Sequence, residues 1–250
     1  MSTAIHPSTW DARIARAREL ASSRPAARDL LTFYASLAEY QRALAIDAQD
    51  PETFDAERVV TAMPGLLAWL RNAGKSDLAE SVDIKSVAAA FRRKDASSVA
   101  NPAEQFVIES LLQAFAEQLV NAEPSPSSGS TPMRCPRCGG PPVVAVLREE
   151  SHGAKRSLLC AFCLHEWHCL RLVCPACGEQ DFDKLPIYTA EQFAHARMDA
   201  CDRCHQYIKT IDLTKDGLAV PCVDDIASVS LDLWARERGY TRIKRNVLGI

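Results

Sequence analysis

Long hydrophobic runs are missing from this sequence of 250 residues. No apolar run approaches the roughly 20 residues that a helix needs to cross a bilayer, so we expect no membrane insertion. The N-terminus also lacks a basic segment followed by an apolar one, which is the pattern of a secretory signal peptide. These absences favour a cytoplasmic protein. The composition, with 47% hydrophobic and 24% charged residues, is typical of a soluble globular chain.

An excess of positive charge is missing as well. Residues 134–250 contain 16 Lys and Arg against 15 Asp and Glu, and residues 1–133 contain 13 against 17. Proteins that bind nucleic acids are usually basic, because they neutralise phosphates. We interpret the small basic cluster of Arg242, Lys244 and Arg245 as a solvated tail, and we expect no nucleic-acid partner.

Cysteine, in contrast, is abundant and regularly spaced. Eight of the ten cysteines form four Cys-x-x-Cys pairs, which are Cys135 and Cys138, Cys160 and Cys163, Cys174 and Cys177, and Cys201 and Cys204. Two such pairs can direct four thiolates at one tetrahedral metal ion. The sequence therefore predicts two tetracysteine metal sites.

The order of the pairs indicates a tandem duplication. Each copy starts Cys-Pro-x-Cys-Gly and has an arginine, Arg156 or Arg197, four residues before its third cysteine. The first and third cysteines are 25 residues apart in one copy and 27 in the other. A nearly fixed offset favours one structural unit used twice. We assign the first two pairs to one site and the last two to the other. The alternative is a cross-braced arrangement, in which the first and third pairs share a metal.

The residues after each pair give a further expectation. Turns of this kind often need a positive φ after the second cysteine, which suits Gly139 and Gly178. The equivalent residues of the other two pairs are Leu164 and His205. A positive φ is strained for a side chain such as Leu. Those two turns are therefore either tilted differently or strained.

Other uses of the cysteines fit less well. Disulfides belong mainly to secreted chains, and a thioredoxin-like pair usually occurs once, in a βαβ context. Cys169 and Cys222 lie outside the pairs, and we interpret them as small buried side chains. His165, His168 and His205 could replace a cysteine ligand, but two complete sets of four make this unnecessary.

Residues 1–121 are predicted to form an all-α domain. Apolar side chains recur with helical spacing in residues 11–22, 27–48, 53–73, 77–93 and from Asn101 onward. We expect an interruption near Pro64. The last helix should begin with Asn101 as N-cap, Pro102 in the first turn and Glu104 completing the cap. This half shows no catalytic pair and no glycine-rich phosphate loop, which favours a scaffold.

The predicted fold class is α+β, with an N-terminal helical domain, two tandem rubredoxin-like or zinc-ribbon metal units and a C-terminal helix. The expected boundaries are a Pro- and Ser-rich linker at 122–133, metal units at 134–172 and 173–221, and a helix and tail at 222–250. Strands are expected at 143–147, 156–159 and 185–188, and the final helix at 224–237, ended by Gly239. Units this small should depend on metal for folding.

Several stretches resemble the family of formate dehydrogenase accessory (formation) proteins, FdhE. These are Cys-Ala-Phe-Cys-Leu-His-Glu-Trp-His at 160–168, Cys-Pro-Ala-Cys-Gly at 174–178, Ala-Cys-Asp-Arg-Cys-His-Gln-Tyr-Ile-Lys at 200–209, Val-Asp-Asp-Ile-Ala at 223–227, Leu-Asp-Leu-Trp-Ala at 231–235, and the end from Gly239-Tyr240 to Gly249. Residues 16–20 and 33–37 resemble the early helices of the family more loosely. The chain is expected to begin later than other members do.

The resemblance implies a cytoplasmic maturation factor and not an enzyme. Its implied partner is the catalytic subunit of a respiratory, molybdenum- and selenocysteine-containing formate dehydrogenase, bound before export through the twin-arginine pathway. The resemblance also implies the eight paired cysteines as metal ligands, and no catalytic residue. Spacing alone favours zinc, whereas the resemblance implies iron. We therefore expect two iron ions, with zinc as the alternative.

Two other functions remain open. One is a zinc-ribbon module that associates with nucleic acid or other proteins, which the near-neutral charge opposes for nucleic acid. The other is an electron-transfer enzyme with two rubredoxin-like centres, although no flavin or haem motif is visible. The oligomeric state does not follow from the sequence.

Overall fold

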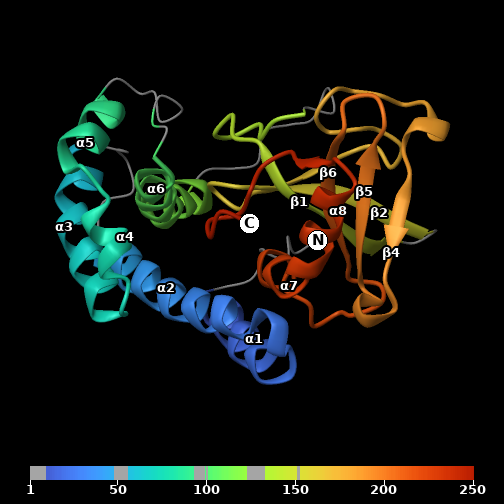
Figure 1. The fold of residues 1–250 in the computed structure, drawn as a ribbon. Coiled ribbons are helices and arrows are strands. Elements are labelled where there is room, and N and C mark those ends of the chain that lie inside the picture. Colours follow the sequence, from blue (N-terminus) through green and yellow to red (C-terminus); the bar gives the residue numbers. More distant parts are fainter. Residues whose placement is uncertain (1–9, 48–55, 93–98, 100, 123–132, 151–152) are drawn as a thin grey trace. The chain divides into compact units, whose positions relative to one another are not determined.

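The computed structural model describes residues 10–47, 56–92, 99, 101–122, 133–150 and 153–250 (Figure 1). Contacts divide the chain into two compact units. The first consists of residues 1–40, 125–248 and 250, and the second of residues 41–124 and 249. Residues 123–132 of the predicted linker lie outside the described part. None of the described helices is long and apolar enough to cross a membrane.

The second unit is helical. It contains the end of α2 (Arg28–Asp47), followed by α3 (Ala56–Asn72), α4 (Ser76–Glu80), α5 (Ile84–Arg92) and α6 (Pro102–Ala122). Its core consists of buried aliphatic side chains, among them Met63 and Leu66 of α3, Val87 of α5 and Leu111 of α6. Helix α3 contacts α4, α5 and α6, and is therefore the central helix of the unit.

Two helix predictions in this unit were wrong. Helix α3 continues through Pro64, whose side chain lies on the exposed face. In place of the single helix predicted at 77–93, the described residues 76–92 form two short helices, α4 and α5. The reason is local, because Asp83 Oδ1 accepts a hydrogen bond from the Lys85 N–H at 2.9 Å and so caps the start of α5.

The start of α6 follows the prediction in part. Asn101 Oδ1 accepts the Ala103 N–H at 2.9 Å, as an N-cap should. Glu104 accepts hydrogen bonds from the Asp83 N–H at 3.2 Å and the Ser86 hydroxyl at 3.0 Å. Its carboxylate thus links α6 to the start of α5.

The first unit is built on one seven-stranded sheet in the order β3-β2-β1-β6-β5-β4, with β7 also paired to β6. Its strands are β1 (Pro142–Glu150), β2 (Gly153–Cys160), β3 (Glu166–His168), β4 (Ile187–Thr189), β5 (Ala196–Cys201), β6 (Gln206–Asp212) and β7 (Thr241–Arg242). The short 3-10 helices include η1 (Pro25–Ala27), η3 (Phe182–Lys184) and η4 (Glu191–Phe193). The two strands predicted for the first copy are β1 and β2, and the strand predicted at 185–188 is β4, shifted toward the C-terminus.

The two cysteine copies share this sheet. Strands β1, β2 and β3 come from the first copy, and β4, β5 and β6 come from the second. Strand β1 pairs with β6 in parallel, from Val144 opposite Lys209 to Leu147 opposite Asp212. The metal units are therefore tandem, as predicted, but they are parts of one sheet and not separate bodies. The continuous burial of residues 142–147 fits a central strand.

Two helices stand where one was predicted at 224–237. Helix α7 (Pro221–Ala227) ends at Ser228, and α8 (Val229–Glu237) follows. Lys209 Nζ donates to the Asp225 carbonyl at 2.5 Å, and the Ser228 hydroxyl donates to the Asp224 carbonyl at 2.9 Å. These two side chains thus donate hydrogen bonds to backbone carbonyls at the end of α7, where the helix stops. Gly239, with φ +79°, ends α8 as predicted.

A buried group of charges joins these helices to the sheet. Lys209 is fully buried and lies 3.0 Å from Asp225 and 2.5 Å from Asp232. Arg242 pairs with the same two carboxylates and its side chain is buried, so its interpretation as part of a solvated tail was wrong. Asn246 donates to Asp225 at 2.8 Å. Two acids thus face two bases, so each buried charge is compensated.

Helix α1 (Trp10–Ser23) contacts α7 through a second buried pair. Arg16 donates to both carboxylate oxygens of Asp224, at 3.1 and 2.7 Å, and to Asp216 at 2.8 Å. His195 also bonds Asp224, at 2.9 Å. Burial alone would raise the pKa of Asp224, but the bonds from His195 and Arg16 hold that pKa below its ordinary value. Asp224 therefore stays ionised.

We predict that Arg16→Met destabilises the first unit by about 3–5 kcal/mol, because it leaves Asp224 as a buried charge with fewer partners. Arg18→Met is the matched control on the same helix. Arg18 is 65% exposed and pairs with Glu39, so its loss should change stability by about 1 kcal/mol or less. Urea denaturation followed by tryptophan fluorescence measures both. Equal, small effects would show that the buried pair does not hold α1 to α7.

Candidate metal centres

Each Cys-x-x-Cys pair lies in a tight turn that ends in the left-handed backbone region. The value of φ is +72° at Gly139, +49° at Leu164, +76° at Gly178 and +53° at His205. The two turns without glycine thus have the same geometry as the other two, and they are strained and not tilted. For a residue with a side chain this conformation costs about 1–2 kcal/mol.

Backbone hydrogen bonds close the turns in the same way in both copies. The N–H of Cys135 donates to the Gly140 carbonyl at 2.8 Å, and that of Cys174 donates to the Glu179 carbonyl at 2.8 Å. In the turn of the second pair, the Cys160 N–H donates to the His165 carbonyl at 3.0 Å, and in the turn of the fourth pair the His205 N–H donates to the Cys201 carbonyl at 2.8 Å. Main-chain hydrogen bonds therefore close all four turns.

The first cluster forms where β1 begins and β2 ends. Cys135 and Cys138 precede β1, Cys160 is the last residue of β2, and Cys163 lies in the next turn. The Sγ atoms of Cys135 and Cys163 are 3.6 Å apart, and those of Cys138 and Cys160 are 3.3 Å apart. All four sulfurs lie within 4.8 Å of one another.

The second cluster repeats this arrangement. Cys174 and Cys177 precede β4, Cys201 ends β5, and Cys204 lies in the turn before β6. The Sγ distances are 3.7 Å between Cys174 and Cys204 and 3.7 Å between Cys177 and Cys201. The structure thus brings the cysteines together in the two sets that the repeat predicts, and not in a cross-brace.

These distances suit a metal and not a disulfide. A disulfide needs sulfurs about 2.0 Å apart, and all ten cysteines are free. Four sulfurs about 2.3 Å from a central ion lie about 3.8 Å from one another. The 3.7 Å spacing of the second cluster is close to this value, and the first cluster is slightly tighter. Both clusters can therefore bind a metal ion.

Four thiols this close do not all ionise on their own. Hydrogen bonds from the Cys138, Cys160 and Cys163 thiols hold the pKa of Cys135 far below its ordinary value. Bonding to the ionised Cys135 raises the pKa of Cys163 far above it. In the second cluster, burial raises the pKa of Cys204 to about 11. A cation removes this conflict, because coordinated thiols are deprotonated outright. The all-sulfur donor set suits zinc or iron.

The same corner of each cluster faces solvent. Cys138 and Cys177, the second cysteine of each copy, are exposed, whereas Cys135, Cys160, Cys163, Cys174 and Cys201 are buried. Cys204 is half-buried, so the first cluster is open to solvent at Cys138 alone, and the second is open at Cys177 and partly at Cys204.

The two copies differ in what packs beside the open corner. In the first copy, a Cβ added to Gly140 would lie 2.6 Å from the Phe162 ring and 3.0 Å from the Cys160 sulfur. In the second copy the equivalent residues are Glu179 and Arg203, which form an ion pair at 3.5 Å. The first copy therefore needs glycine at a position where the second carries a side chain.

Among the described residues, Cys169, Cys222, His165 and His168 are not in the clusters. Cys169 is buried, 3.7 Å from the Arg156 guanidinium, and Cys222 lies 3.6 Å from the Tyr34 hydroxyl. His165 contributes its backbone carbonyl to a turn, and burial lowers the pKa of its side chain, with Arg137 adding to the effect. His168 is exposed at the end of β3.

The sequence did not indicate a third group of potential ligands, His195, Asp216 and Asp224. The Arg16 guanidinium lies between the two carboxylates and donates to both. We interpret this group as part of the buried ion pair of α1 and α7. No sequence signal could have found this ion pair, since Arg16 lies 208 residues before Asp224.

Two adjoining family models match the cysteine region. The model described as FdhE, central domain, matches residues 134–171, and FdhE, C-terminal domain, matches residues 172–248. The boundary between the models falls just before Cys174, between the two sets of cysteines.

Similar proteins carry the same family name. A Protein FdhE homolog of Aquifex aeolicus is 43% identical over 116 residues, which are 46% of this chain and 41% of that protein. One of Haemophilus influenzae (strain PittGG) is 35% identical over 109 residues, or 43% and 35% of the two chains. The matches thus span about two fifths of the length of these relatives.

A solved structure shares the fold over nearly the whole chain. The crystal structure of the FdhE protein from Pseudomonas aeruginosa aligns with a TM-score of 0.79 and 24% sequence identity. The alignment covers 97% of each chain, including the helical half.

We predict that Cys135→Ser with Cys138→Ser halves the bound metal and opens residues 134–172 to protease, because lost ligands are lost folding energy. Elemental analysis at saturating metal and limited proteolysis measure these effects. Cys222→Ala is the control and should keep the full metal content. Unchanged metal in the double variant would contradict the assignment of the pairs, and lost metal in the control would make Cys222 a ligand.

We also predict that Gly140→Ala weakens metal binding at the first cluster by about 1–3 kcal/mol, because the new methyl group must displace Phe162 or the sulfurs. Gly139→Ala separates this effect from backbone strain, since a Cβ there meets nothing within 4 Å although φ is +72°. Competition with a zinc chelator measures both. A loss of affinity that is larger in Gly139→Ala would reject the steric explanation.

Proposed function

Because this chain belongs to the FdhE family, we propose that it is an accessory factor of formate dehydrogenase. In this proposal it binds the catalytic subunit of a respiratory formate dehydrogenase in the cytoplasm and assists its assembly before export. It carries out no reaction of its own. The observation that carries the proposal is the match of both cysteine units, in order, to the two FdhE domains over residues 134–248.

We propose that each cluster holds one metal ion, and that the ion is iron. The ligands are Cys135, Cys138, Cys160 and Cys163 in the first site and Cys174, Cys177, Cys201 and Cys204 in the second. When bound, a tetrathiolate iron supplies one-electron chemistry that zinc lacks. The protein supplies the turns, the burial of most sulfurs and an exposed thiol at the second cysteine of each copy. Zinc is the alternative, and it would make both sites structural only.

We propose that the helical second unit serves as a docking scaffold. Its described residues present amphipathic helices around α3. The fold is shared with the solved FdhE protein over 97% of the chain, so this helical part is not peculiar to the present sequence.

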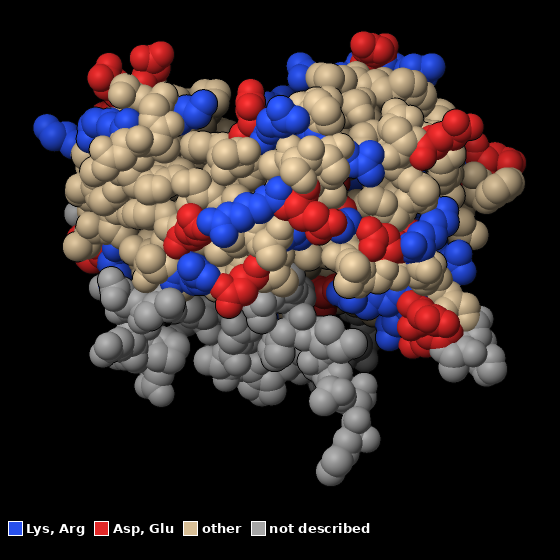
Figure 2. Space-filling model, turned by 90° about the horizontal axis from the view of Figure 1, so that it is seen from below, with Lys and Arg blue, Asp and Glu red and all other residues tan. Residues whose placement is uncertain are grey.

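A nucleic-acid-associated zinc ribbon is the main alternative, because such ribbons use the same turns. The charge distribution opposes it. On the face drawn in Figure 2, Lys and Arg side chains are interspersed with Asp and Glu side chains, and the described residues there form no broad surface of positive charge. The formal net charge of the chain is −3.

The proposal predicts that tagged protein, isolated anaerobically from its own host, retains a formate dehydrogenase catalytic subunit with its export signal uncleaved. Mass spectrometry identifies the retained proteins, and elemental analysis of the same sample identifies the metal. A variant with Ser at all eight paired cysteines is the control. It should lose both the metal and the dehydrogenase subunit, which we call the client.

Three results of this experiment decide between the alternatives. Recovery of RNA polymerase, ribosome or nucleic acid in place of the dehydrogenase would reject the accessory role. Two zinc ions per chain with no iron would reject iron as the metal, but would not bear on binding of the dehydrogenase subunit. Client retained by the variant without cysteines would separate client binding from the metal sites.

A further inference from the structure

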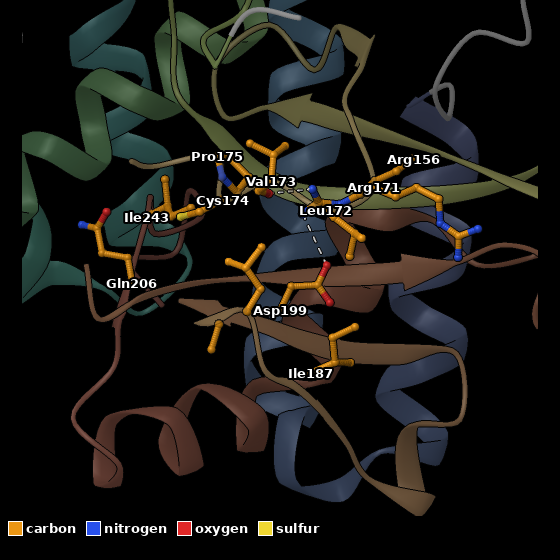
Figure 3. A pocket seen from close by; sticks show the side chains of 12 residues that line it. Arg156, Arg171, Leu172, Val173, Cys174, Pro175, Ile187, Asp199, Gln206 and Ile243 are labelled. Carbon is orange, nitrogen blue, oxygen red and sulfur yellow. Dashed lines mark hydrogen bonds and ion pairs between the residues drawn. The ribbon is translucent and has the colours of Figure 1, made fainter. Parts of the chain in front are cut away.

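Arg156 belongs to the first copy but holds a segment of the second. It lies on β2, four residues before the cluster residue Cys160, and its side chain is 2% exposed. Its Nη1 donates to the carbonyls of Leu170 and Val173, both at 3.1 Å. Val173 directly precedes Cys174, so this guanidinium fixes the backbone that leads into the second cluster (Figure 3).

The same guanidinium also reaches the strand that carries the third cysteine of the second copy. Arg156 Nη2 donates to Asp199 Oδ2 at 3.3 Å, and Asp199 lies on β5 two residues before Cys201. Asp199 further accepts Arg197 Nε at 2.9 Å and the Thr210 hydroxyl at 2.7 Å. The equivalent arginines of the two copies, Arg156 and Arg197, therefore meet at one carboxylate.

Solvent is a poor replacement for this guanidinium. Arg156 and Asp199 line a pocket of about 30 Å³, whose rim includes the half-exposed side chains of Leu172 and Ile187 (Figure 3). Without Arg156, the two carbonyls and the carboxylate would lose a charged donor that water replaces incompletely.

We propose that Arg156 couples the two metal sites, so that a metal ion in the first cluster raises the affinity of the second. A bound ion fixes Cys160 and with it the end of β2. This fixes Arg156, which in turn positions the segments that lead to Cys174 and Cys201. Strand β6 begins at Gln206, two residues after Cys204, and its parallel pairing with β1 from Lys209 onward supports the same coupling. By linkage, an ion in the second site raises the affinity of the first by the same factor.

This inference rests on the metal binding proposed above, and Zn²⁺ is the probe that tests it. The full-length, metal-free chain is titrated with Zn²⁺ against a competing chelator. Cys135→Ser with Cys138→Ser reports the second site with the first disabled, and the unaltered chain reports it with the first filled. We expect the second site to bind Zn²⁺ about tenfold more weakly when the first is disabled.

Arg156→Met should abolish this difference, leaving less than about a twofold effect. Arg197→Met is the matched control, because Arg197 occupies the equivalent position and bonds the same Asp199, but from within β5. It should leave the tenfold difference in place. Asp199→Asn, which keeps the bonds of Arg156 to the two carbonyls, should reduce the difference only in part.

Hydrogen exchange gives a second readout that does not depend on the affinity of the second site. In Cys174→Ser with Cys177→Ser, Zn²⁺ in the first cluster should slow amide exchange at residues 172–174 and 199–201. Adding Arg156→Met should remove this slowing, and adding Arg197→Met should not. Circular dichroism of each variant establishes that it is folded.

The outcomes separate the two proposals. If the unaltered chain binds no Zn²⁺, the metal-binding part of the proposed function fails. If it binds Zn²⁺ at both sites with equal second-site affinity whether the first is filled or disabled, the coupling is rejected and the metal sites stand. Equal effects of Arg156→Met and Arg197→Met would also reject the role given to Arg156.

Discussion

The cysteine turns impose the constraint on which the rest of the first unit depends. The two sulfurs of a Cys-x-x-Cys pair converge only if the backbone turns back after the second cysteine, and all four turns do so through a left-handed residue. Two of these residues are not glycine. The strain at Leu164 persists because its side chain is buried in a core cluster with Val143 and Leu159. Apolar packing thus stabilises a turn that the backbone preference of Leu opposes. Metal binding by the neighbouring Cys163 would stabilise the same turn further.

Because the two copies share one sheet, the repeat forms one structural unit and not two. Two small metal units would each lack a core. Joined through β1 and β6, they form a surface wide enough to be covered by α7 and α8, which pack Leu231 against Val146 and Ile211. The buried charges of Lys209, Asp225, Asp232 and Arg242 lie at this same junction. Stability and metal geometry are therefore properties of the pair of copies, and neither copy holds them alone.

Sequence reasoning succeeded where the determining interactions are local. The spacing of the cysteines predicted both sets of four sulfurs. Gly139 and Gly178 predicted two of the turns, Asn101 predicted the start of α6, and Gly239 predicted the end of α8. Prediction from the sequence failed where the local structure depends on a residue far away in the chain. The break at Ser228 depends on Lys209 reaching in from β6, and the anchoring of α1 depends on a pair 208 residues apart. The parallel pairing of β1 with β6 could not be predicted, because a buried strand has the same apolar sequence pattern whichever strand it pairs with.

The strand order has a consequence for assembly. Reading the sheet as β3-β2-β1 followed by β6-β5-β4 shows that each copy presents the same two edges in the same direction. Such a head-to-tail contact has no built-in end, and in principle a further copy of the chain could be added to either side. The second copy ends the series by shortening its outer strand, since β4 has 3 residues where its counterpart β1 has 9. A truncated edge offers too few main-chain groups for another sheet to continue. The repeat that forms two cysteine clusters thus also ends in a strand too short to extend the sheet.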